Sequence, residues 1–445
     1  MQQRPLEVDR RHLDTPVPAV HGAPAAPQAA PTTLGTFASL RVRDFRLLLL
    51  GTTLANAAQW IQQVTLGWLV YDLTASGTML GTINLVRSVA SVGLAPLAGV
   101  LIDRFERRRL MLAINGWLTG ISSVLGLVLL SGRAEVWFLF LFTFAGGLAQ
   151  AVDMPLRQTA AFLLVPRPMA PNAVALIQTG WSLMRSLGPG VGGFLILWFG
   201  PGGNFLVQAT AYALIAVTVW WIRFPPLPAS GRRGGGLQYL KQGLRFVAGE
   251  RTTRTFLMMG WVLPLLIIPN FAALPPIYAK DVFAGGPQVL GFLMSAVGSG
   301  GILGGLLTAS LGRVERRGVV QLTSLLLTSL SLIGFALSTE LWVALVMLAL
   351  SGFFEMVFLT TNQTLLQLSI PDELRGRVTS VASLSMGLSP LGSFVAGVGA
   401  DLLGPATITI VLCTISSAVA ILVFCFSATV REYRLSQALA TAPRR

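Results

Sequence analysis

The sequence predicts an all-α membrane protein in which 12 transmembrane helices form two pseudo-symmetric six-helix bundles. Three observations support this fold class. Of the 445 residues, 53% are hydrophobic and only 11% are charged, whereas soluble domains are about a quarter charged. Twelve apolar runs are each long enough to cross a bilayer, which takes about 20 helical residues. The second half of the chain also repeats patterns of the first half in the same order.

The apolar runs fall into two groups of six. We expect the first spans at 46–71, 78–102, 109–131, 136–157, 173–198 and 202–223. We expect the others at 255–278, 287–311, 318–337, 340–366, 377–403 and 406–428. The predicted segments are a disordered cytoplasmic tail (1–36), a first bundle (37–223), a linker (224–252), a second bundle (253–430) and a C-terminal tail (431–445). Within the linker, Leu240, Leu244 and Val247 fit an amphipathic helix on the membrane surface, and a solvated linker fits almost equally well.

Basic residues gather in every second loop. They are Arg41, Arg43, Arg46, Arg104, Arg107 to Arg109, Arg167, several in the 223–254 loop, Arg313, Arg316, Arg317, Arg375, Arg377, Arg431 and Arg434. The other loops hold little that is basic beyond Arg133 and Lys280. Because basic loops stay on the cytoplasmic side, we expect both termini in the cytoplasm of a bacterial cell, with the protein in its inner membrane. The net charge of +14 therefore reflects topology and not nucleic-acid binding.

A basic loop motif occurs once in each half. Asp103 ends an apolar run and is followed by Arg104 to Arg108, which return as Arg313 to Arg317 with Gly312 in place of the acid. A duplicated six-helix unit is typical of secondary transporters. The sequence has no GxxxxGK[ST] phosphate loop, catalytic constellation or metal-ligand cluster, so we expect neither an enzyme nor a cofactor.

A second repeat places one membrane carboxylate in a special position. Residues 146–166 align without gaps on 351–371, so that Gln150 corresponds to Glu355. A carboxylate at that depth is costly to keep charged, which suits a group that gains and loses a proton. Glu355 and Asp153 are therefore the candidates for proton coupling, and a structural role in packing or in an arginine pair is the alternative.

Four short motifs indicate one family of membrane transporters. Residues 99–108 (GVLIDRFERR) are similar to a G-x-L-x-D-R-x-G-R-R motif, with Glu106 where that motif has glycine, and 188–193 (GPGVGG) match a helix-5 motif of proton-exchanging exporters. Residues 153–157 (DMPLR) and 371–378 (PDELRGRV) are typical of exporters of enterobactin and macrolides. After residue 36 the chain thus resembles the major facilitator superfamily, in particular its enterobactin-exporter and macrolide-efflux branch.

The resemblance implies a conformational latch at the cytoplasmic helix ends. Its candidates are Asp103, Arg104, Arg107, Asp153 and Arg157. In the family, the acid at the position of Asp103 docks on the N-terminus of helix 11, which carries a partial positive charge. Arg107 is expected to pair with Asp153, and both contacts close the cytoplasmic side. Asp153 can instead pair with Arg157 four residues on, and Asp103 can instead be a boundary residue without a partner.

Several polar side chains lie inside the predicted spans and are candidates to line a substrate cavity. They are Asn56, Gln59, Gln63, Arg87, Gln150, Arg185 and Asn270. Intramembrane arginines face protein or a wet cavity, so Arg87 and Arg185 either attract an anionic substrate or satisfy structural partners such as Glu355. The helix-5 residues Gly188, Pro189, Gly192 and Gly193 serve either the exporter motif or close helix packing alone.

The sequence therefore predicts a monomeric, proton-coupled exporter that works by rocker-switch alternating access. Its expected partners are a small organic substrate such as a drug, siderophore or other secondary metabolite, the proton and the lipid bilayer. An importer or uniporter on the same fold, and a membrane partner or sensor that transports nothing, are the alternatives.

Overall fold

The computed structural model describes residue 35 and residues 37–225, 236–310, 315–371 and 374–431, and within these ranges it consists of helices and their connections. Almost all of the predicted N-terminal tail and the C-terminal tail beyond Arg431 fall outside them. So do Gly312 and Arg313 of the second basic motif, and Asp372 and Glu373 of the 371–378 motif.

The first half of the chain forms five long helices. They are α1 (Arg43–Thr74), α2 (Gly77–Arg104), α3 (Arg107–Leu130), α4 (Val136–Leu164) and α5 (Ala170–Trp221), with short turns η1 (Ala38–Arg41) and η2 (Arg167–Met169). Inside α5 the backbone of Gly200 has φ 68° and ψ 173°, a conformation that glycine adopts far more readily than other residues. Because Pro201 follows, the helix breaks there, and α5 supplies both the fifth and the sixth span.

The second half contains more interrupted helices. They are α6 (Gly236–Gly249), α7 (Arg251–Val262), η3 (Leu263–Ile267), α8 (Pro269–Ala272), α9 (Pro275–Ile277), η4 (Tyr278–Val282), α10 (Pro287–Ser310), α11 (Arg317–Ala336), α12 (Leu341–Leu368), α13 (Arg375–Ser385), η7 (Met386–Leu388), α14 (Ser389–Leu403), α15 (Pro405–Phe426) and α16 (Ala428–Arg431). Prolines at 264, 269, 275 and 276 interrupt the seventh span. The segment α6 occupies the predicted linker and packs on α13.

The twelve predicted crossings are confirmed. They comprise α1 to α4, the two parts of α5, the broken span 251–282, α10 to α12, the broken span 375–403 and α15. Among the described residues, nine helical segments are long and apolar enough by themselves to cross a membrane. The outer surface fits a lipid environment, since Trp220 is 61% exposed and Leu306 is 66% exposed, while amides such as Gln208 are buried inside the bundles.

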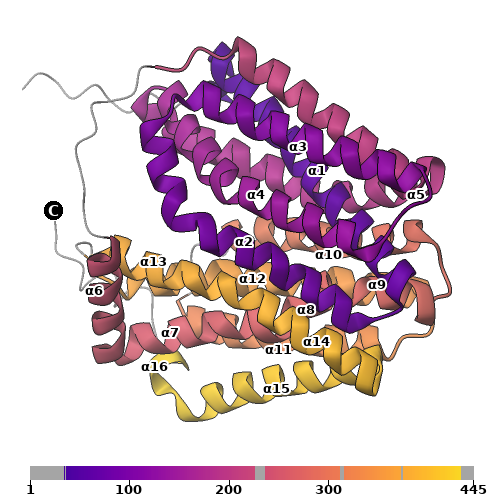
Figure 1. Ribbon diagram of the computed structural model, residues 1–445. Coiled ribbons are helices and arrows are strands. Elements are labelled where there is room, and N and C mark those ends of the chain that lie inside the picture. Colours follow the sequence, from indigo (N-terminus) through magenta and orange to yellow (C-terminus); the bar gives the residue numbers. More distant parts are fainter. Residues whose placement is uncertain (1–34, 36, 226–235, 311–314, 372–373, 432–445) are drawn as a thin grey trace, which may run out of the picture.

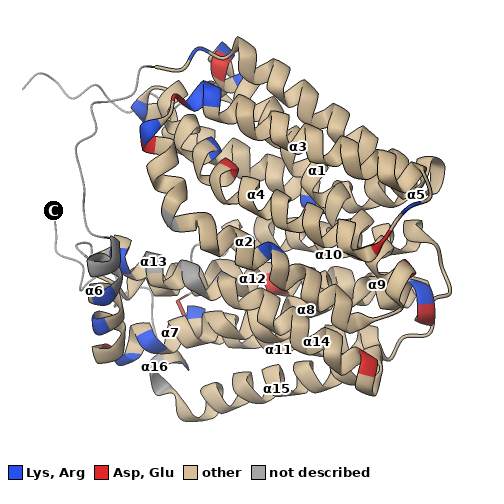
Figure 2. Ribbon diagram, viewed as in Figure 1, with Lys and Arg blue, Asp and Glu red and all other residues tan. Residues whose placement is uncertain are grey.

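Charge is distributed unevenly along the bundle axis. Figure 2 shows that most lysine and arginine residues lie at the end that holds α6, which we call the basic end. The helix ends and connections at the other end, called the opposite end below, carry Asp72, Glu135, Asp281, Glu340 and Asp401 among the described residues, with Arg133 and Lys280.

The main contacts between the halves are those of α2 with α14 and of α5 with α10 (Figure 1). The glycines of the helix-5 motif make the second contact possible. A β-carbon at Gly193 would lie 2.6 Å from the carbonyl oxygen of Pro287, and one at Gly291 would lie 2.7 Å from that of Pro189. On the other side of α5, a β-carbon at Gly188 would lie 2.7 Å from Cβ of Trp60. The motif therefore packs α5 directly between α1 and α10.

Substitution Gly193→Val is expected to lower the melting temperature of the purified protein. Because the new side chain meets the backbone of α10, α5 and α10 must separate, and overpacking of this kind costs about 1–3 kcal/mol. Gly116→Val is the control, since no atom lies within 4 Å of a β-carbon built at Gly116. Equal melting temperatures for the two variants would contradict this account of the motif.

Candidate functional site

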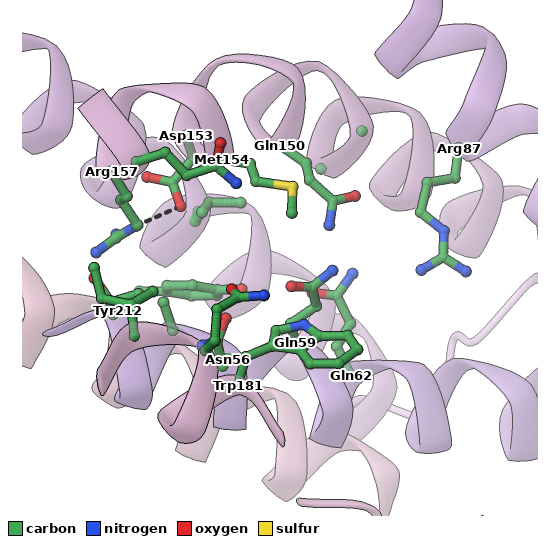
Figure 3. A pocket seen from close by; sticks show the side chains of 18 residues that line it. Asn56, Gln59, Gln62, Arg87, Gln150, Asp153, Met154, Arg157, Trp181 and Tyr212 are labelled. Atoms are coloured by element: carbon green, nitrogen blue, oxygen red, sulfur yellow. Dashed lines mark hydrogen bonds and ion pairs between the residues drawn. The ribbon is translucent and has the colours of Figure 1, made fainter. Parts of the chain in front are cut away.

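A polar cavity lies inside the first half, between α1, α2, α4 and α5 (Figure 3). It offers about 140 Å³ to the centre of a water molecule. Its lining residues include Thr52, Asn56, Gln59, Gln62, Arg87, Gln150, Asp153, Met154, Arg157, Gln158, Gln178, Trp181 and Tyr212. The structure thus brings together six of the predicted site residues, namely Asn56, Gln59, Arg87, Gln150, Asp153 and Arg157.

Asp153 and Arg157 form an ion pair at one end of this cavity. The Arg157 Nε lies 2.7 Å from Asp153 Oδ2, and a second guanidinium nitrogen donates to Asn115 Oδ1 at 3.4 Å. Of the two pairings that the sequence permits for Asp153, the structure therefore contains the local one along α4. Within the described residues, Arg107 Nε and Asp153 Oδ1 are buried and have no hydrogen-bond partner.

A second ion pair crosses between the halves. Arg185 on α5 donates to Glu355 on α12 at 2.7 Å. Glu355 is only 3% exposed, and the Arg185 guanidinium carbon lies 5.7 Å from the ring centroid of Trp181, which lines the cavity. Arg185 and Glu355 therefore face each other. Removing either partner of a buried pair leaves the other charge desolvated, which costs about 3–5 kcal/mol.

The corresponding region of the second half is uncharged. At the offset of the 146–166 repeat, Asn362 corresponds to Arg157, and its Oδ1 accepts from Gln321 Nε2 at 2.6 Å. The pocket around it is lined by amide, hydroxyl and apolar side chains, among them Gln363, Gln367 and Thr379. Among the described residues that line these two pockets, the charged side chains therefore belong to the first half.

Close contacts bind the halves together at the opposite end. Asp401 near the end of α14 accepts from the backbone N–H of Gly77 at 2.6 Å and of Thr78 at 2.9 Å, and from the hydroxyl of Ser76 at 2.8 Å. Asp401 thereby caps the N-terminus of α2, which belongs to the other half. Lys280 Nζ also lies 2.6 Å from Asp72 Oδ1, and Tyr71 donates to Asp281.

At the basic end, the contact predicted for the latch residue Asp103 is not formed among the described residues. Asp103 is exposed and, within the described part of the chain, has no hydrogen bond or ion pair. Arg104 is also exposed, whereas Arg107 at the start of α3 is buried. The structure is therefore joined at the opposite end, while the Asp103 contact is not formed.

A family model described as "transmembrane secretion effector" matches residues 34–444. The chain belongs to this family. Its members sit within the major facilitator superfamily, so that superfamily and its transport function, predicted from the four motifs, are confirmed.

Curated relatives match most of this chain and most of their own length. The multidrug efflux pump Tap of Mycobacterium tuberculosis is 30% identical over 382 residues, covering 80% of this chain and 87% of Tap. The staphyloferrin A transporter of Staphylococcus aureus is 24% identical, with 78% of this chain and 86% of that protein covered. The macrolide efflux protein A of Streptococcus pyogenes is 23% identical, with 77% and 86% covered.

Solved structures share the fold. A POT family transporter in complex with 5-aminolevulinic acid matches with TM-score 0.70 and 13% identity, covering 87% of this chain and 96% of that one. An inward-facing bacterial homologue of ferroportin matches with TM-score 0.66 and 17% identity, covering 85% and 98%.

Some residues that line the cavity differ from those that the sequence predicted. On α1 the lining includes Gln62 and not Gln63. Both follow Gln59 by about one helical turn, so spacing alone could not separate them; Gln62 faces inward and accepts from Gln208 Nε2 at 2.6 Å. Gln178 and Trp181 on α5 lie three residues apart, a helical spacing that could have identified them.

Asn270 lies outside the cavity. It is fully buried, and its amide donates to the carbonyl oxygens of Leu266 and Ile267 at 2.9 and 3.3 Å. These carbonyls belong to the π-helical turn of the seventh span, where the regular helical bonding is disturbed. Asn270 therefore stabilises the broken seventh span and does not line the cavity.

Proposed function

We propose that the protein is a proton-coupled exporter of a small organic molecule and works by rocker-switch alternating access. The observation that carries this proposal is the Arg185–Glu355 ion pair, which crosses between the halves beside the polar cavity. A pair in that position changes strength when Glu355 takes up a proton, and it must change geometry when the halves rotate. It can therefore link protonation to the conformational change.

The basic end faces the cytoplasm in this proposal, because positively charged loops stay on that side. The contacts of Asp401, Asp72 and Asp281 then close the extracytoplasmic side, and the structure corresponds to an inward-facing state. In this state Glu355 is ionised and holds Arg185, and the substrate enters from the cytoplasm.

Protonation acts after the switch. In the outward-facing state a proton from outside binds the Glu355 carboxylate and removes the negative charge that holds Arg185. The neutral carboxyl group weakens the cross-half pair and favours release of the substrate. Return to the inward-facing state passes the proton to the cytoplasm and restores the pair, so a proton enters as the substrate leaves.

The outward-facing state needs a closed cytoplasmic side, and the predicted latch supplies it. Asp103 reaches the N-terminus of α13, and Asp153 changes its partner from Arg157 to Arg107. The buried Nε of Arg107 and Oδ1 of Asp153, both without hydrogen-bond partners here, support this exchange, because each gains the bond that it lacks.

Efflux from cells that express the protein is expected to depend on the proton gradient. Cells are loaded with a lipophilic cationic dye, an anionic dye or a catecholate siderophore, and retention is followed with and without a protonophore. Expression should lower retention of at least one compound, and the protonophore should abolish the difference. Efflux that persists in the protonophore would contradict proton coupling, and uptake in place of efflux would contradict export.

A further inference from the structure

Arg87 is a cavity arginine without a carboxylate partner. Its side chain extends from α2 to one end of the cavity (Figure 3). Its guanidinium donates to Asn84 Oδ1, one turn away on the same helix. In the described part of the chain, no ion pair includes Arg87.

The other charges around the cavity neutralise each other. Arg157 is paired with Asp153, and Arg185 is paired with Glu355. Arg87 therefore contributes one uncompensated positive charge to a polar space inside the membrane. Charged groups at this depth pair with opposite charges, and attraction between charges is stronger there than in water.

The wall between Arg87 and Asp153 is made of amides. Figure 3 shows Gln59, Gln62 and Gln150 between the two charged ends of the cavity, with the Trp181 ring below them. A carboxamide both donates and accepts hydrogen bonds, and an indole offers a flat apolar surface. The wall can thus satisfy hydroxyl or carbonyl groups on a molecule that also has a planar apolar part.

We infer that the cavity binds organic anions, with a carboxylate of the ligand on Arg87 and its neutral polar groups on the amide wall. Arginine suits this role because its planar fork donates two parallel hydrogen bonds to a carboxylate. The inference rests on the proposed function, since it names the class of molecule that the exporter carries.

Two dyes with the same ring system and opposite charge test the inference. Fluorescein is an anion with a carboxylate, whereas tetramethylrhodamine methyl ester is a cation without one. Binding of each to the purified protein in detergent is measured by the anisotropy of the dye, with no ion gradient present. We expect fluorescein to bind more tightly, and Arg87→Gln to weaken it by about 10- to 100-fold, the value of a charge-assisted hydrogen bond. Binding of the cation should be unchanged or tighter in this variant.

Arg133→Gln is the matched control, because it removes an exposed arginine from a loop at the opposite end. Tighter binding of the cationic dye to the unaltered protein would overturn the inference, and this holds even if Arg87→Gln fails to fold. Equal loss of fluorescein binding in Arg87→Gln and Arg133→Gln would also overturn it.

Proton-driven efflux from proteoliposomes is measured separately. If the protein exports both dyes equally, the proposed function stands and the inference fails. If the anion binds but neither dye is exported, anion binding stands and the proposed function fails.

Discussion

Glu355→Gln is expected to reduce proton-driven efflux to the level of cells that lack the protein. The substitution keeps the size and the hydrogen-bonding oxygen of the side chain but removes the group that takes up a proton. It therefore resembles Glu355 fixed in its protonated form. Arg185 keeps a neutral hydrogen-bonding partner 2.7 Å away in the starting geometry, which offsets part of the cost of leaving its charge without a carboxylate.

The loss should be specific to coupling. With substrate on both sides of the proteoliposome membrane and no proton gradient, exchange of substrate is expected to continue in Glu355→Gln, because that exchange does not require the proton to move. The measurement is therefore made twice on the same vesicles, once with an imposed pH gradient and once with substrate on both sides. Only the first signal should vanish.

Glu340→Gln is the control for the chemical change. Glu340 is exposed and lies directly before the N-terminus of α12. The same substitution there removes an acid that touches neither the cavity nor the other half. Full proton-driven efflux in Glu355→Gln would show that Glu355 only packs against Arg185. Loss of exchange as well as of coupled efflux would show that the pair is needed for the conformational change itself.

The features that could be predicted are those that depend on local sequence. Apolar length and alternate basic loops determine the spans, and the motif residues determine the superfamily. The i, i+4 spacing of Asp153 and Arg157 also predicted that they can pair. The interruption at Gly200 coincides with the gap between two predicted spans, so the continuous α5 changes the helix count and not the number of crossings.

Contacts between distant segments were not predictable in the same way. Arg185 and Glu355 are separated by 170 positions. The sequence offered Glu355 as one possible partner of the membrane arginines, but it could not decide between that pairing and a role in lining the cavity. Asp401 was missed altogether. It ends the eleventh span as Asp103 ends the second, but comparison of the two halves aligned Asp103 with Gly312 at the end of the eighth span. The correspondence between Asp401 and Asp103 depends on which helices of the two halves face each other, and hydropathy carries no information about that pairing.

Asp401→Asn and Asp103→Asn are expected to shift the conformational equilibrium in opposite directions. In the structure, Asp401 caps the N-terminus of α2 through Gly77 and Thr78. In the proposed outward-facing state, Asp103 at the end of α2 caps the N-terminus of α13. Each acid thus stabilises one state, at one side of the membrane, through the partial positive charge of a helix start.

The size of the shift follows from the bonds that are lost. Charge-assisted hydrogen bonds contribute about 1.5–3 kcal/mol each, and the exposure of Asp401 argues for the low end. A loss of about 1.5 kcal/mol changes the ratio of the two states roughly tenfold. Asp401→Asn should therefore raise the outward-facing population by about that factor. Adding Asp103→Asn should restore the inward-facing population, because it weakens the competing state.

Distances between spin labels at the basic end measure this equilibrium. Labels at cysteines replacing Arg109 and Arg316, both exposed, in a chain without Cys413 and Cys425, should move closer when the cytoplasmic side closes. Glu135→Gln is the control, since Glu135 is an acid of the opposite end that accepts from Trp137 within its own half. An unchanged distance distribution in Asp401→Asn, or a shift in the same direction for both aspartates, would show that these acids do not act as reciprocal caps. Opposite shifts would establish that Asp401 caps α2 when the opposite end is closed and that Asp103 caps α13 when the basic end is closed.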